Sequence, residues 1–206
     1  MANKLTDLKN TLTDALGSQL SVEAMTWLRE KAASASVPAQ LYAAFAAVPR
    51  KTGRASVTIS SEPGKSLAHA RENFSIENWS IDRVARVWLL MHVDSSDREK
   101  YFKTIEGLFP AAEVNELVAL YSALPVLDYP GLWKQRCAEG IRSNIADVLR
   151  AIMCNNPYPS ENLDEQAWNQ LVLKAFFTDK PVDAIIGFDA RRNAASASPS
   201  RARSLP

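Results

Sequence analysis

Residues that commonly build metal and catalytic sites are scarce in this sequence. Its 206 residues include only two histidines, two cysteines and seven glycines. His69 and His92 stand in no His-Glu-x-x-His arrangement and near no cysteine at ligand spacing, so a metal site is not expected. Neither a glycine-rich phosphate loop nor a Gly-x-Ser-x-Gly segment is present. We therefore expect no metal, no cofactor and no assignable catalytic residue.

Long hydrophobic runs and an excess of one charge are also missing. The longest apolar run, residues 87–91, is far shorter than the roughly 20 residues of a membrane-spanning helix. Residues 1–10 are polar and lack the apolar stretch of a signal peptide. The 24 basic residues nearly balance the 23 acidic ones, which gives no basic surface for nucleic acid. These absences predict a cytoplasmic protein that neither spans a membrane nor binds nucleic acid.

Both cysteines are expected in the hydrophobic core. Cys137 and Cys154 lie within amphipathic helical patterns, and a pair so placed is a poor disulfide framework. Arg136 precedes Cys137 and could lower the pKa of its thiol. Because Cys137 shares an apolar stripe with Trp133 and Ile141, we interpret it as a core residue rather than a nucleophile.

Helical periodicity dominates the first part of the chain. Four leucines within residues 5–16 lie three or four positions apart, on one face of a helix that ends at Gly17. A second helix is expected after Ser21, a good N-cap residue, and a third from Pro38. Periodicity fades over residues 49–79, where Gly, Pro and Ser clusters predict an irregular insertion.

The second part of the chain predicts further helices. The helix after Ser80 is apolar on nearly every side, which indicates a buried central element. Ser96 has capping-box spacing for the next helix, and Pro110 is expected to open the one after it. One continuous helical stretch is expected over residues 129–152, and Asn162 is expected to cap the last strong helix.

These patterns predict an all-α fold. Successive helical pairs with short links favour an α-α superhelical stack or an irregular helical bundle, although no fixed-period repeat is present. A single domain should span residues 1–190. Residues 191–206 are small and polar in composition, which predicts a disordered tail.

Polar residues on the expected helices of region 128–178 are the candidates for a site. On a continuous helix Asn144 would point its amide into the apolar stripe, where an unpaired polar group costs about 1 to 3 kcal/mol. Asn169 lies at the edge of the next helix's apolar face, and Glu139 and Arg142 are spaced to pair along a helix flank.

The segment Asn-Asn-Pro-Tyr-Pro at residues 155–159 joins these helices. An asparagine suits the left-handed turn that ends a helix, and the prolines should display Tyr158 rigidly. One interpretation is that Asn144, Asn169 and Arg142 bond the carbonyl groups of this loop, as most buried side-chain amides do. The other is a pocket for an aromatic metabolite. The candidate ligand-binding residues are Glu139, Arg142, Asn144, Asn155, Asn156, Tyr158, Trp168, Asn169 and Lys174.

Four segments carry a family resemblance. They are Tyr-Pro at 129–130, Ala-Glu-Gly-Ile-Arg-Ser-Asn at 138–144, the segment at 155–159, and Ala-Trp-Asn-Gln-Leu-Val-Leu-Lys-Ala at 167–175. Their order and spacing resemble the EboA family of bacterial metabolite-traffic proteins. The resemblance implies a cytosolic helical protein from a small operon, associated with moving a secondary-metabolite precursor toward the periplasm. It supplies no established catalytic residues.

Two functions are consistent with these features. The first is a non-enzymatic binding or scaffold component, whose partner is a small-molecule metabolite or another protein of the operon. Such operons also encode a membrane prenyltransferase-like protein, which the resemblance adds to the candidate partners. The alternative is a small-molecule-modifying enzyme of the same pathway, with Glu139 or Lys174 as acid or base.

Overall fold

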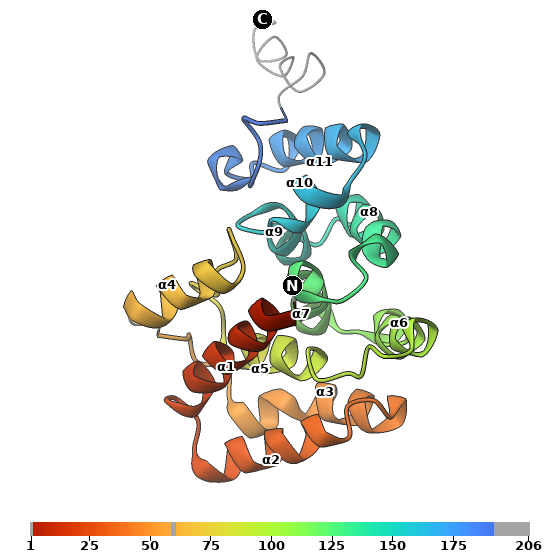
Figure 1. Ribbon diagram of the computed structural model, residues 1–206. Coiled ribbons are helices and arrows are strands. Elements are labelled where there is room, and N and C mark those ends of the chain that lie inside the picture. The colour runs from red at the N-terminus through yellow and green to blue at the C-terminus, as the bar shows by residue number, and fades with distance from the viewer. Residues whose placement is uncertain (1, 59–60, 192–206) are drawn as a thin grey trace, which may run out of the picture.

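The computed structural model describes residues 2–58 and 61–191, and these residues form helices and connecting turns (Figure 1). No strand occurs within these two ranges, where the single isolated bridge joins Ser56 and Ser80. The all-α prediction is therefore confirmed. The α-helices are α1 Ala2–Gly17, α2 Val22–Ala33, α3 Pro38–Thr52, α4 Ser61–Ala70, α5 Ile81–Leu90, α6 Arg98–Glu106, α7 Val114–Ala123, α8 Lys134–Arg142, α9 Ala146–Met153, α10 Tyr158–Asn162 and α11 Glu165–Phe177. The 3-10 helices are η1 Phe109–Ala111, η2 Leu124–Val126, η3 Pro130–Trp133 and η4 Val182–Ala184.

Helix α5 is the central element of the amino-terminal half, as predicted. It packs against α1, α2, α3 and α7, and its apolar side chains are almost fully buried. The next contact runs from α7 to α9, so α7 links the cluster α1–α5 to the cluster α8–α11 at the other end of the molecule (Figure 1). The molecule is therefore a stack of helices around one continuous core rather than a symmetric bundle.

The starts of the early helices follow the sequence closely. The Ser21 hydroxyl accepts a hydrogen bond from the Ala24 amide at 3.2 Å and caps α2, while Pro38 occupies the first position of α3. Helix α1 ends at Gly17 as predicted. These helix boundaries depend only on neighbouring residues, so they could be predicted from the sequence.

Other helix boundaries differ from the prediction. Asp97, not Ser96, caps α6, because its carboxylate accepts from the amides of Glu99 and Lys100, both at 3.0 Å. Pro110 lies within η1, and α7 begins only at Val114.

The last long helix also starts later than predicted. Asp164, not Asn162, caps α11, and its carboxylate accepts from the Ala167 amide at 2.8 Å. Asn162 instead ends α10, where its side-chain amide donates to the Tyr158 carbonyl at 3.1 Å.

The segments expected to be irregular are partly ordered. Helix α3 continues through Pro49 to Thr52, and α4 occupies part of the 49–79 stretch. Residues 192–206, most of the predicted disordered tail, lie outside the described residues. Arg191, the first residue of that tail, is held in place: its guanidinium donates to the carbonyls of Ser160 and Leu163, both at 3.0 Å.

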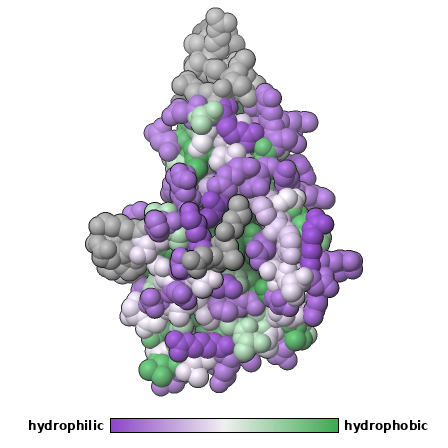
Figure 2. Space-filling view, in the orientation of Figure 1, coloured by the Kyte–Doolittle hydropathy of each residue, from purple (hydrophilic) through white to green (hydrophobic). Residues whose placement is uncertain are grey.

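The visible molecular surface is mostly hydrophilic. Figure 2 shows hydrophobic side chains in small separate spots on this face rather than in one broad patch. Within the described ranges, no helix has the length and apolar character needed to cross a membrane.

Candidate functional site

Asn156 is the buried amide that holds the site region together. Its side chain donates to the carbonyls of Tyr121 on α7 and Ala151 on α9, at 3.1 and 2.9 Å, and accepts from the Tyr158 amide at 3.0 Å. Only 5% of the residue is exposed. Three backbone groups from three segments are thus satisfied by one side chain, which joins α7, α9 and α10.

Tyr158 is not displayed at the surface as the sequence suggested. It is fully buried at the start of α10, and its hydroxyl donates to the Pro130 carbonyl at 2.5 Å. Burial raises the pKa of this phenol above its ordinary value of 10. The neighbouring Asn155 does adopt the predicted left-handed conformation, with φ of 52°, and its backbone amide donates to the Ala184 carbonyl.

Trp168 on α11 is also buried, beneath the guanidinium of Arg191. That group lies 4.7 Å from the centre of the indole ring, a cation-π contact. Together with the Arg191 bonds to the carbonyls of Ser160 and Leu163, the contact fastens the chain after η4 to α10 and α11. Arg191 thus bonds carbonyls in and just after α10, whereas the carbonyls that Asn156 bonds belong to α7 and α9.

The prediction that Asn144 points into an apolar stripe is wrong. The helical stretch breaks at residues 143–145, where the backbone is extended and the Ser143 hydroxyl accepts from the Ile145 amide. Asn144 is therefore exposed, and its side-chain oxygen accepts from the Lys174 ammonium on α11 at 2.9 Å. Asn169 is half-buried on the same helix.

Glu139 pairs with a different arginine from the one predicted. Arg136 bonds the Glu139 carboxylate at 2.7 Å and Glu106 on α6 through its other nitrogens, while its guanidinium lies 4.8 Å from the Phe109 ring centre. Arg142, the expected partner, is exposed. Glu139 and Lys174, the two candidate acid or base groups, are thus each engaged by a separate partner.

Cys137 lies in the core, as predicted. It is fully buried, and burial raises the pKa of its thiol to about 12. The adjacent Arg136 does not lower this pKa, because its guanidinium is directed to Glu106 and Glu139. A protonated, inaccessible thiol is a poor nucleophile.

Gly140 allows α8 to approach α7 and α9 closely. A Cβ at this position would lie 2.4 Å from the Ile152 Cδ1 and 2.7 Å from the ring of Tyr121. Gly140→Ala is therefore expected to lower the free energy of unfolding by about 1 to 3 kcal/mol, the range for overpacking a core. Urea denaturation measures this loss. Gly131→Ala is the matched control, because nothing lies within 4 Å of the added atom; an equal loss there would contradict the steric explanation.

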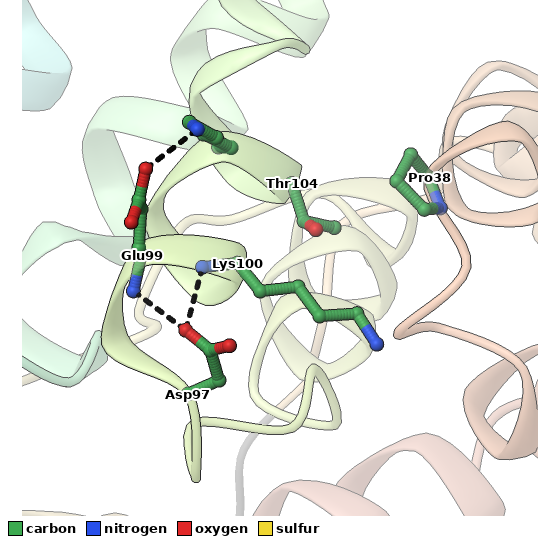
Figure 3. A pocket seen from close by; sticks show the side chains of 6 residues that line it. Pro38, Asp97, Glu99, Lys100 and Thr104 are labelled. Atoms are coloured by element: carbon green, nitrogen blue, oxygen red, sulfur yellow. Dashed lines mark hydrogen bonds and ion pairs between the residues drawn. The ribbon is translucent and has the colours of Figure 1, made fainter.

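Two hollows on the surface lie away from the nine predicted ligand residues. One, with a volume of about 380 Å³, is lined by Pro38, Asp97, Glu99, Lys100, Lys103 and Thr104 (Figure 3). The other, of about 460 Å³, is lined by Asp7, Asn10, Thr11, Ser66, His69 and Ala70. Both lie within the first 104 residues, outside region 128–178 where the sequence predicted a ligand site.

Asn156, Tyr158 and Trp168 of the motif-bearing segments are thus buried among helices, and the described part of the chain is helical. The same chain matches the family model "Metabolite traffic protein EboA" over residues 8–200. It belongs to the EboA family. Searches of curated proteins and of solved structures gave no match.

Proposed function

We propose that this EboA family member is a non-enzymatic binding component of a metabolite-trafficking system and acts by holding another protein of that system. The proposal rests on an exposed apolar surface on α11. Phe177 is 82% exposed and Leu173, one helical turn earlier on the same side, is 39% exposed. Aromatic side chains surrounded by polar groups are typical anchors of protein interfaces.

The turn between α8 and α9 is tied to α11 by the hydrogen bond from Lys174 to Asn144, and the adjacent Ile145 is 37% exposed. We name Leu173 and Phe177 the α11 face. Lys174 and Asn144 supply polar groups beside it, which suits an interface with an apolar centre and a polar rim.

The partner is a protein encoded with this chain, and the membrane prenyltransferase-like protein is the first candidate. The system would be bacterial and would carry a secondary-metabolite precursor toward the periplasm, with this chain acting as a scaffold on the cytoplasmic side. The alternative of a modifying enzyme has less support, because Arg136 engages Glu139 and Asn144 engages Lys174.

Co-purification tests the proposal. The tagged full chain, expressed with the other operon proteins, should recover at least one of them, and Leu173→Ser/Phe177→Ser should reduce recovery about tenfold, as loss of an interface anchor does. Val22→Ser is the matched control, because Val22 is 78% exposed on α2 at the opposite end of the molecule. Recovery of no operon protein, or equal recovery by the α11 variant, would overturn the proposal.

A further inference from the structure

The hollow in Figure 3 lies between the start of α3 and one side of α6. Pro38 forms one wall, and residues one turn apart on α6 form the other. Its volume of about 380 Å³ is sufficient for part of a small organic molecule.

Most charges around the hollow are already satisfied. The Asp97 carboxylate caps α6 by accepting from two backbone amides, and Glu99 pairs with Lys103 at 2.6 Å. Lys100 differs from these groups: within the described residues its ammonium has no ion pair, and its side chain extends into the gap toward Pro38 (Figure 3). One positive charge therefore remains available to a solute.

Thr104 adds a buried hydrogen-bond donor. The residue is only 2% exposed and lines the hollow, yet its hydroxyl has no hydrogen bond to any described part of the chain. Four other threonines donate to the carbonyl four residues earlier; these are Thr11, Thr13, Thr52 and Thr178. The Thr104 hydroxyl is therefore free to donate to an acceptor in the hollow.

The start of α3 adds little to this preference. Val37 precedes the helix and provides no side-chain cap, and the first turn of this 15-residue helix contains no acidic residue. The positive end of the α3 dipole thus meets no acidic side chain of its own first turn where Pro38 borders the hollow, but Pro38 has no N–H to donate and the Gln40 and Leu41 amides already bond the Val37 carbonyl. The Lys100 ammonium and the Thr104 hydroxyl are the groups that favour an anion here.

We propose that this hollow binds the carboxylate of a small molecule. One carboxylate oxygen accepts from the Lys100 ammonium and the other from the Thr104 hydroxyl. A single available cation and one neutral donor suit a singly charged group, because the carboxylates of Asp97 and Glu99 that line the hollow repel a phosphate dianion more strongly than a monoanion. The site does not depend on the proposed α11 face, which lies in the other half of the chain.

Titration of the purified full chain with benzoate, followed through backbone amide NMR shifts, tests this site. Shifts should centre on residues 100–104. Lys100→Met should weaken binding about tenfold and the isosteric Thr104→Val by a similar factor, the size expected for a charge-assisted and a buried hydrogen bond. Lys134→Met, at an exposed position, and Thr11→Val, at a half-buried position that lines the other hollow, are the matched controls and should bind as the wild type does.

Several outcomes would overturn the assignment: no saturable shift, wild-type affinity in both variants, or tighter binding of inorganic phosphate than of benzoate. Because Lys100 is exposed, its variant retains the fold and keeps the test valid if Thr104→Val is unstable. Leu173→Ser/Phe177→Ser should still bind benzoate. Lys100→Met should still recover the operon partner, so failure of this site is distinguishable from failure of the proposed function.

Discussion

Asp82→Ala is expected to lower the free energy of unfolding by about 3 to 5 kcal/mol, which is the cost of removing one partner of a buried ion pair. Arg86 and Asp82 are bonded at 2.8 Å with side chains only 3% and 4% exposed. Without Asp82 the nearest carboxylate to Arg86 is that of Glu116, at 3.7 Å. Burial lowers the pKa of Arg86 although both carboxylates act to raise it, which indicates how strongly the site disfavours an unpaired charge. Urea denaturation measures the loss.

Arg86 occupies this position because of a proline in α3. Pro49 has no N–H, so the Phe45 carbonyl lacks the donor that normally lies four residues ahead in a helix. The Arg86 Nε donates to that carbonyl at 3.0 Å instead. The arginine thereby supplies the hydrogen bond that the Phe45 carbonyl lacks within α3, and it joins α3 to α5. Asp82 keeps the guanidinium in place.

An exposed pair with the same spacing provides the control. Glu99 and Lys103 are also four residues apart and are bonded at 2.6 Å, but their side chains are 77% and 72% exposed. Glu99→Ala is expected to change stability by less than about 0.5 kcal/mol, since solvent screens such pairs. Equal losses for Asp82→Ala and Glu99→Ala would contradict the role assigned to burial.

The all-helical fold could be predicted because the spacing of leucine and valine residues indicates which face of each helix is buried. The break at residues 143–145 could not, because Ile141, Ile145 and Val148 keep helical spacing across it. Ile145 is nevertheless partly exposed, and Asn144 turns outward with it. A pattern of apolar residues cannot distinguish one helix from two that continue the same stripe.

The cap errors have a related cause. Ser96 and Asp97, and likewise Asn162 and Asp164, are all good capping residues within two positions of each other. The choice depends on which oxygen reaches the first free amides, and tertiary packing sets that geometry. The charged pair on α5 could have been recognised from the sequence, because Asp82 and Arg86 are four residues apart on an otherwise apolar helix.

The ligand site in region 128–178 stays a prediction. Within that region, Asn156 of segment 155–159 joins α7, α9 and α10, and the left-handed Asn155 followed from its residue type. The prediction for Tyr158 was wrong because a residue before proline only prefers the extended conformation. In this structure α10 begins at Tyr158 instead. Arg191 was missed because its carbonyl partners lie 28 or more residues earlier, beyond any local pattern.

Asn156→Ala tests whether the motif around it supports the fold. The change leaves the carbonyls of Tyr121 and Ala151 and the amide of Tyr158 without their bonds, so the free energy of unfolding should fall by about 3 kcal/mol or more, at roughly 1 kcal/mol or more per buried group. Asn144→Ala is the matched control. It removes one exposed hydrogen bond to Lys174 and should cost less than about 0.5 kcal/mol.

The comparison of the two asparagines separates support from recognition. If Asn156→Ala unfolds at much lower urea than Asn144→Ala while Asn156→Ala still recovers the operon partner at low denaturant, the motif serves the fold and the α11 face serves binding. If Asn156→Ala is as stable as the wild type, the three bonds contribute nothing net, and the segment at 155–159 must matter for a reason other than joining α7, α9 and α10.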